Sequence, residues 1–150
     1  MSTQKERETM RHIANSIIDE ASKGDVFAKG YLLMISRITR LIDDIYDQDT
    51  EVSRENLLEV LQYLFIELPV NPFFNEYRDM LLSQHVSMYN AWQAANVYEK
   101  GDEVDRVYAH VWRDTCNEIV PIVALLIGGY EHMVAMSFKT RQLFKKQLGE

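Results

Sequence analysis

Apolar residues recur at helical spacing along almost the whole chain. Between about Val26 and Asp47 the apolar stripe comprises Tyr31, Met34, Ile35, Ile38, Leu41, Ile42 and Ile45. Side chains three and four positions apart share one face of an α-helix, so this spacing predicts an amphipathic helix with a buried face. No segment shows the apolar–polar alternation that is typical of a β-strand. The pattern therefore predicts an all-α protein.

Capping residues divide this pattern into a compact bundle of about five to seven helices. Gly24 followed by Asp25 is typical of the end of one helix and the N-cap of the next. Asn71 is a good N-cap, and Pro72 suits a first helical position, where its missing N–H costs nothing. We expect a long helix to start there, with a break near residues 83–85.

The remaining segments fit the same scheme. Ser53 can cap a third helix, whose predicted core face comprises Leu57, Leu61, Leu64, Phe65 and Leu68. A further helix is expected from about Asp102, and Pro121 predicts a kink or a restart because it cannot donate to the helical ladder. Gly128 and Gly129 indicate a bend before a final helix. With no internal repeat or linker, residues 1–150 are expected to form a single helical domain.

Composition narrows the classes of function. A formal charge of -7 argues against general nucleic-acid binding and against binding to an anionic membrane, since both need excess Lys and Arg. The only cysteine is Cys116, so no intrachain disulfide is expected. The N-terminus lacks the apolar core of a signal peptide, and the apolar run from Ile119 to Ile127 is about half the length of a membrane span. We expect a cytoplasmic location.

The stretch LIDDIYDQD places three carboxylates, those of Asp43, Asp44 and Asp47, near the end of the second helix. Their i, i+3 and i, i+4 spacings allow all three to meet one ion, and hard oxygen ligands suit Mg²⁺ or Mn²⁺. Carboxylates at a helix C-terminus repel one another and oppose the helix dipole, and a cation would relieve that conflict. The same aspartates also lie opposite the apolar stripe. A solvated polar face is thus the other interpretation, and both stay open.

The motif DDIYD is similar to the aspartate-rich DDxxD motif of class I isoprenoid synthases. What this five-residue resemblance implies is chemistry: aspartates at this spacing can bridge magnesium to a diphosphate. A second resemblance is to the all-α nucleotide pyrophosphohydrolases, which place acidic pairs on facing helices. The corresponding residues here are Asp44 with Asp47, and Asn96 with Glu99 from the stretch WQAANVYE.

Two further polar clusters are candidates for the same site. Trp92, Asn96 and Glu99 share a helix face with His85 and Met88. This face can line a pocket, or Trp92 can pack at a boundary while Asn96 and Glu99 lie in solvent.

In the stretch HVWRDTCNE, Arg113 could bind a substrate phosphate through paired hydrogen bonds, and His110 could act as a general acid or base. Asp114 could complete the metal site, and Glu99 could complete or orient it or take part in catalysis. The alternative for this cluster is a salt bridge between helices.

The order DDxxD, NPFF, AW…N..E and a histidine before RD is similar to that of small helical proteins of tailed phages and prophages. This resemblance implies a phage-encoded factor that acts on a host metabolite or a host protein. Two hypotheses follow. One is a Mg²⁺-dependent protein that binds or hydrolyses a phosphorylated or diphosphate small molecule such as a nucleotide; if it is an enzyme, it is a metal-dependent hydrolase or lyase. The other is a non-catalytic helical interaction protein. Surplus apolar helix faces predict a homodimer in either case.

Overall fold

The computed structural model describes residues 3–48 and 51–148. Within these ranges the chain forms helices and no strand, so the prediction of an all-α fold is confirmed. The α-helices are α1 (Gln4–Ser22), α2 (Val26–Asp47), α3 (Arg54–Gln62), α4 (Leu68–Val70), α5 (Pro72–Glu76), α6 (Arg78–Tyr98), α7 (Glu103–Thr115), α8 (Ile119–Gly128) and α9 (Tyr130–Leu148). A π-helical turn, η1 (Tyr63–Glu67), joins α3 to α4, and a 3-10 turn, η2 (Cys116–Glu118), joins α7 to α8.

Capping at the predicted residues sets the main helix boundaries. The carboxylate of Asp25 accepts hydrogen bonds from the first backbone N–H groups of α2, and Gly24 has the positive φ of 82° that favours glycine. The side chain of Asn71 accepts from Phe74 N at 2.9 Å and donates to Phe27 O at 3.1 Å. Asn71 therefore both caps α5 and ties it to the start of α2.

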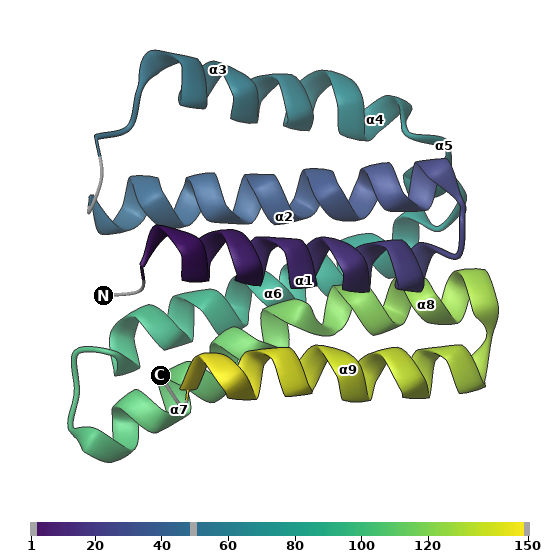
Figure 1. Ribbon diagram of the computed structural model, residues 1–150. Coiled ribbons are helices and arrows are strands. Elements are labelled where there is room, and N and C mark those ends of the chain that lie inside the picture. Colours follow the sequence, from purple (N-terminus) through teal and green to yellow (C-terminus); the bar gives the residue numbers. More distant parts are fainter. Residues whose placement is uncertain (1–2, 49–50, 149–150) are drawn as a thin grey trace.

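α2 lies at the centre of the fold (Figure 1), between α1 on one side and α3 and α4 on the other. α8 and α9 pack against each other and against α1, while α6 pairs with α7. The core residues that α2 contributes are Ala28, Tyr31, Leu32, Met34, Ile35, Ile38 and Leu41. The predicted stripe is thus correct over most of its length. It fails near the C-terminus of α2, where Ile42 is exposed and Ile45 is half-buried.

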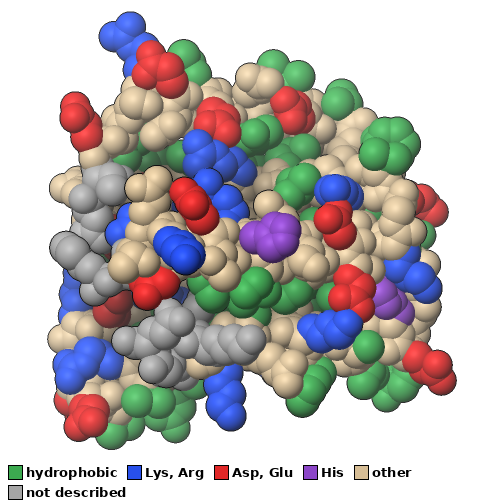
Figure 2. Space-filling model, viewed as in Figure 1, with side chains coloured by type: hydrophobic (Ala, Val, Ile, Leu, Met, Phe, Trp, Pro, Cys, Tyr) green, Lys and Arg blue, Asp and Glu red, His purple; other side chains and the backbone are tan. Residues whose placement is uncertain are grey.

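The predicted core face of the third helix is wrong except at its end. Leu57, Leu61, Leu64 and Phe65 are exposed, and among the predicted residues only Leu68 is buried. The physical reason is that α3 has α2 on one side and no other described helix packed closely against it. Figure 2 accordingly shows hydrophobic side chains at the surface over α3 and α4.

The long helix after Asn71 is also interrupted at a different place from the one expected. The break lies at Tyr77, between α5 and α6, and α6 runs without interruption through residues 83–85. No helix in the described part of the chain is both long enough and apolar enough to cross a membrane.

Candidate functional site

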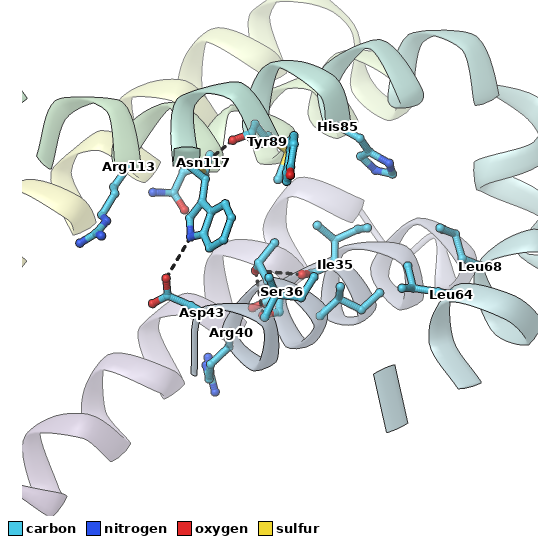
Figure 3. A pocket seen from close by; sticks show the side chains of 16 residues that line it. Ile35, Ser36, Arg40, Asp43, Leu64, Leu68, His85, Tyr89, Arg113 and Asn117 are labelled. Carbon is cyan, nitrogen blue, oxygen red and sulfur yellow. Dashed lines mark hydrogen bonds between the residues drawn. The ribbon is translucent and has the colours of Figure 1, made fainter. Parts of the chain in front are cut away.

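An open groove of about 540 Å³ runs between α2 and α6, with η1, α4 and η2 forming its other borders (Figure 3). Its apolar walls are formed by Ile35, Ile38, Ile42, Leu64, Leu68, Met88 and Trp92. His85 and Leu68 lie toward one end, and Asp43 and Arg113 lie toward the other. The groove therefore has a long apolar middle with polar groups at both ends.

The loose packing of the α3–η1 segment leaves this groove open. From the apolar face of that segment only Val60 and Leu68 are buried, and Leu64 borders the groove without closing it. The segment is held to α2 by paired hydrogen bonds from Arg37 to the carboxylate of Glu59, both at 2.9 Å. The hydrogen bond from Arg37 is the main cause that lowers the pKa of Glu59. This polar clamp, together with the few buried residues Val60 and Leu68, holds the wall in position.

At one end of the groove the indole of Trp92 donates a hydrogen bond to Asp43 at 3.0 Å, as Figure 3 shows. The Trp92 ring also contacts Tyr46 edge-on, with ring centroids 5.1 Å apart, and stacks on Tyr89 at 6.0 Å. Two residues that the sequence assigned to separate clusters, Asp43 and Trp92, are therefore in direct contact. Sequence spacing alone could not predict this contact, because the two residues lie on different helices, α2 and α6.

The three aspartates of α2 lie near two different arginines. The charges of Asp43 and Asp47 act on Arg113, whereas that of Asp44 acts on Arg37. Over the residues that the structure describes, no three His, Cys, Asp or Glu side chains are grouped so that they could hold a metal ion. The predicted Mg²⁺ or Mn²⁺ site stays a prediction.

Arg113 joins α7 to α6 at this end of the groove. Its guanidinium donates to both carboxylate oxygens of Glu99, at 2.9 and 2.8 Å, and to Asn96 Oδ1 at 3.1 Å. The hydrogen bonds between Arg113 and Glu99 are the main cause that raises the pKa of Arg113 and lowers that of Glu99. The predicted clusters around Trp92 and Arg113 therefore meet, and the proposed phosphate-binding arginine is already occupied by a carboxylate.

His110 and Asp114 do not line the groove. The His110 ring stacks on Phe144 with centroids 4.3 Å apart, and the Asp114 carboxylate lies 3.6 Å from the guanidinium of Arg141 on α9. His110 Nε2 and Asp114 Oδ1 are buried without a hydrogen-bond partner in the described structure. These two side chains contact α9 and do not line the groove.

A side-chain contact that the sequence did not predict lies at the other end of the groove. The hydroxyl of Tyr31 and Nε2 of His85 are 2.6 Å apart, and both rings stack with Phe74. Burial raises the pKa of Tyr31 and lowers that of His85, so both groups are neutral at pH 7. The only signal in the sequence was that His85 shares a helix face with Met88 and Trp92.

No family model, curated protein or solved structure matches the chain. Its chemistry must then be inferred from the groove itself. The one thiol that lines the groove, Cys116, is hydrogen-bonded to Met88 O at 3.5 Å, and burial raises its pKa, so it is protonated at neutral pH. The groove is otherwise mainly apolar, and its charged lining residues are Arg40, Asp43 and Arg113.

Proposed function

We propose that the protein is a binding protein that holds an elongated, mainly apolar small molecule in the groove between α2 and α6. The observation that carries this proposal is the groove itself. Its volume of about 540 Å³ lies within the range of about 300–1,000 Å³ that is usual for small-molecule sites. Its walls are mainly aliphatic, and a few polar groups at the ends can orient a ligand.

Charge favours a neutral or cationic ligand over a phosphorylated one. Arg113 already donates to Glu99 and Asn96, and Asp43 and Asp47 lie near enough for their charges to act on it. A phosphate at this end would have to displace a carboxylate from Arg113 and would be repelled by the remaining ones. Binding of a phosphorylated molecule at this end would therefore depend on the predicted metal ion or on Arg40, the other arginine that lines the groove.

The test uses the neutral dye N-phenyl-1-naphthylamine, whose emission rises in apolar sites. Leu64 is partly exposed on the groove wall, so Leu64→Trp should narrow the groove without opening a cavity in the core. Leu58→Trp, on the same segment but away from the groove, is the matched control. We expect saturable dye binding to the parent and to the control, and at least about tenfold weaker binding to Leu64→Trp, equivalent to about 1.4 kcal/mol. Equal binding by all three proteins would contradict the proposal.

A second candidate function is a protein–protein interaction through the outer side of the α3–η1–α4 segment. The observation that favours it is the exposure there of several large apolar side chains, which are Leu57, Leu58, Leu61, Phe65, Ile66 and Val70. Contiguous exposed apolar patches often indicate interaction sites.

A photo-cross-linking amino acid at position 65 tests this interaction, with the same label at the exposed Gln93 on α6 as the control. One defined cross-linked protein from position 65 and none from position 93 is the expected result. The same products from both positions would contradict it.

A further inference from the structure

A second, smaller cavity adjoins the groove along α2. Its volume is about 220 Å³, and α1, α2, η2, α8 and α9 surround it. The apolar side chains that line it include Ile17, Ile18, Leu32, Val120, Leu143 and Phe144. Dry apolar cavities of about 150 Å³ are large enough to bind benzene, so this inner cavity has room for part of an aliphatic chain.

The groove and the inner cavity share a wall. Ile35, Ser36, Thr39, Met88, Cys116 and Asn117 line both of them. These side chains come from α2, α6 and η2, and they form the layer between the two spaces. A ligand with an alkyl chain could therefore extend from the groove into the inner cavity if the side chains of this one layer move aside.

The polar groups of the shared wall divide into two kinds. The Thr39 hydroxyl donates to Ile35 O at 3.0 Å, and the Cys116 thiol donates to Met88 O at 3.5 Å. By contrast, the Ser36 hydroxyl and the Asn117 amide make no hydrogen bond to any residue that the structure describes. They come from opposite sides of the groove, Ser36 from α2 and Asn117 from η2 (Figure 3).

We infer that the ligand is an acyl amide or acyl ester, bound with its carbonyl group at the shared wall. The Ser36 O–H and the Asn117 N–H donate to the carbonyl oxygen, the acyl chain extends into the inner cavity, and the rest of the molecule lies in the groove. A neutral carbonyl suits this place because it satisfies both donors without bringing a negative charge toward Asp43. This inference rests on the proposed function, since it specifies the ligand of the same groove.

The experiment compares N-methyldecanamide with decyl methyl ether, a probe of the same length that lacks the carbonyl oxygen and the amide N–H. Their affinities are measured by displacement of N-phenyl-1-naphthylamine from the parent protein. Two donated hydrogen bonds should make the amide bind about tenfold more tightly than the ether. The Ser36→Ala/Asn117→Ala double variant should bind the two probes with equal affinity.

A cavity-filling variant tests where the acyl chain lies. Ala14 lines the inner cavity from α1, and leucine is also a good helix former, so Ala14→Leu should fill the cavity and keep α1 intact. Ala135→Leu, at an exposed position of α9, is the matched control. We expect Ala14→Leu to weaken binding of N-methyldecanamide at least tenfold while dye binding stays at the level of the parent.

The outcomes separate this inference from the proposed function. If the parent binds the dye, but Ala14→Leu and the double variant bind N-methyldecanamide as the parent does, the groove site stands and the acyl-ligand inference is overturned. If the parent binds neither the dye nor the probes, both proposals are overturned.

Discussion

At the scale of single residues, Arg113 satisfies a buried amide that has few other partners. Asn96 is only 4% exposed, its Oδ1 accepts from Arg113, and its Nδ2 has no hydrogen-bond partner in the described structure. Arg113→Met would leave both polar atoms of this amide unpaired, which typically costs about 1–3 kcal/mol. We expect urea unfolding to show a loss of stability of that size.

Glu99→Gln is the comparison for this prediction. The Glu99 side chain is 49% exposed, so its ion pair with Arg113 is screened by solvent, and the expected loss is below about 1 kcal/mol. The Asn96–Arg113 hydrogen bond remains in this variant. A larger loss from Glu99→Gln than from Arg113→Met would contradict the assigned role of Asn96.

His85 gives a prediction about pH. Because burial lowers its pKa in the folded protein, the unfolded chain binds a proton first as the pH falls below the ordinary value of about 6.5. The contribution of neutral His85 to stability is therefore fully present above that pH, and it is lost progressively as the pH falls toward and through the lower, folded-state pKa. His85→Gln can still accept from the Tyr31 hydroxyl but does not titrate, so its free energy of unfolding should change less between pH 7.5 and pH 5. The free energies of unfolding are measured by urea unfolding at both pH values. An equal change between the two pH values in both proteins would refute this assignment.

The magnesium hypothesis has its test at the aspartates of α2. If a divalent cation relieves their repulsion, millimolar magnesium raises the melting temperature, and Asp43→Asn with Asp47→Asn abolishes the rise. Asparagine can still accept the hydrogen bond from Trp92, so the double variant keeps that contact. Asp114→Asn is a useful comparison because Asp114 lies beside Arg141 and away from the groove. An unchanged melting curve in the parent, or an equal rise in the double variant, would count against the hypothesis.

The residues of the candidate site differ in how far the sequence could predict them. Trp92, Asn96 and Glu99 were grouped correctly because helical spacing places them on one face. Their contacts with Asp43 and Arg113 depend on how α2, α6 and α7 pack, which spacing within one helix does not specify. Ser36 and Asn117 carried no signal at all, since an isolated serine or asparagine in a helix is most often a solvated residue.

At the scale of elements, the α3–η1 segment is the least firmly packed of the longer helical segments. Phe65 is 75% exposed, and the clamp between Arg37 and Glu59 is the main polar tie to α2. Segments with few buried apolar contacts open locally more often, so backbone amides of residues 54–67 should exchange with deuterium faster than those of α6. N-Phenyl-1-naphthylamine in the groove should slow exchange near Leu64. Equal protection of α3 and α6 without ligand would contradict this expectation.

The boundaries of the helices were easier to predict than the faces they bury. Asp25, Asn71 and Asp102 cap helices at or next to the expected positions, because capping depends on local backbone hydrogen bonds. The buried face of α3 was wrong because an apolar stripe is buried only where another element covers it. The break at Tyr77 was missed for a related reason. Asn71 ties α5 to the start of α2, and this long-range contact is not visible in the local sequence around the boundary between α5 and α6.

At the scale of the whole molecule, the groove and the inner cavity lie next to each other along one face of α2, where Ile35, Ser36 and Thr39 line both. Ser36 is half-buried where the two spaces meet, whereas Thr39, which also lines both, is exposed. The net charge can be counted from the sequence, but the shared wall between the two spaces depends on how α2, α6 and η2 pack, which composition does not specify.

The last prediction concerns self-association through α9. Tyr130, Val134 and Phe138 follow one another at four-residue spacing and are all exposed, Phe138 by 66%, so they form an apolar stripe along the helix. Two such stripes related by a two-fold axis would cover each other, which is the commonest closed arrangement of two identical chains. We expect a dimer by light scattering at micromolar concentration, and Phe138→Asp should shift it toward monomer.

Two variants define what that result means. Val97→Asp, at an equally exposed apolar position of α6, should leave the dimer intact. Phe65→Asp distinguishes the α9 stripe from the apolar outer side of the α3–η1 segment, and it too should leave the dimer intact if α9 is the interface. A charge placed on the stripe would have to be desolvated in the dimer, whereas a charge elsewhere stays in water, so only Phe138→Asp should weaken association strongly. A parent protein that is monomeric over the whole concentration range would show that the exposed α9 stripe does not drive self-association.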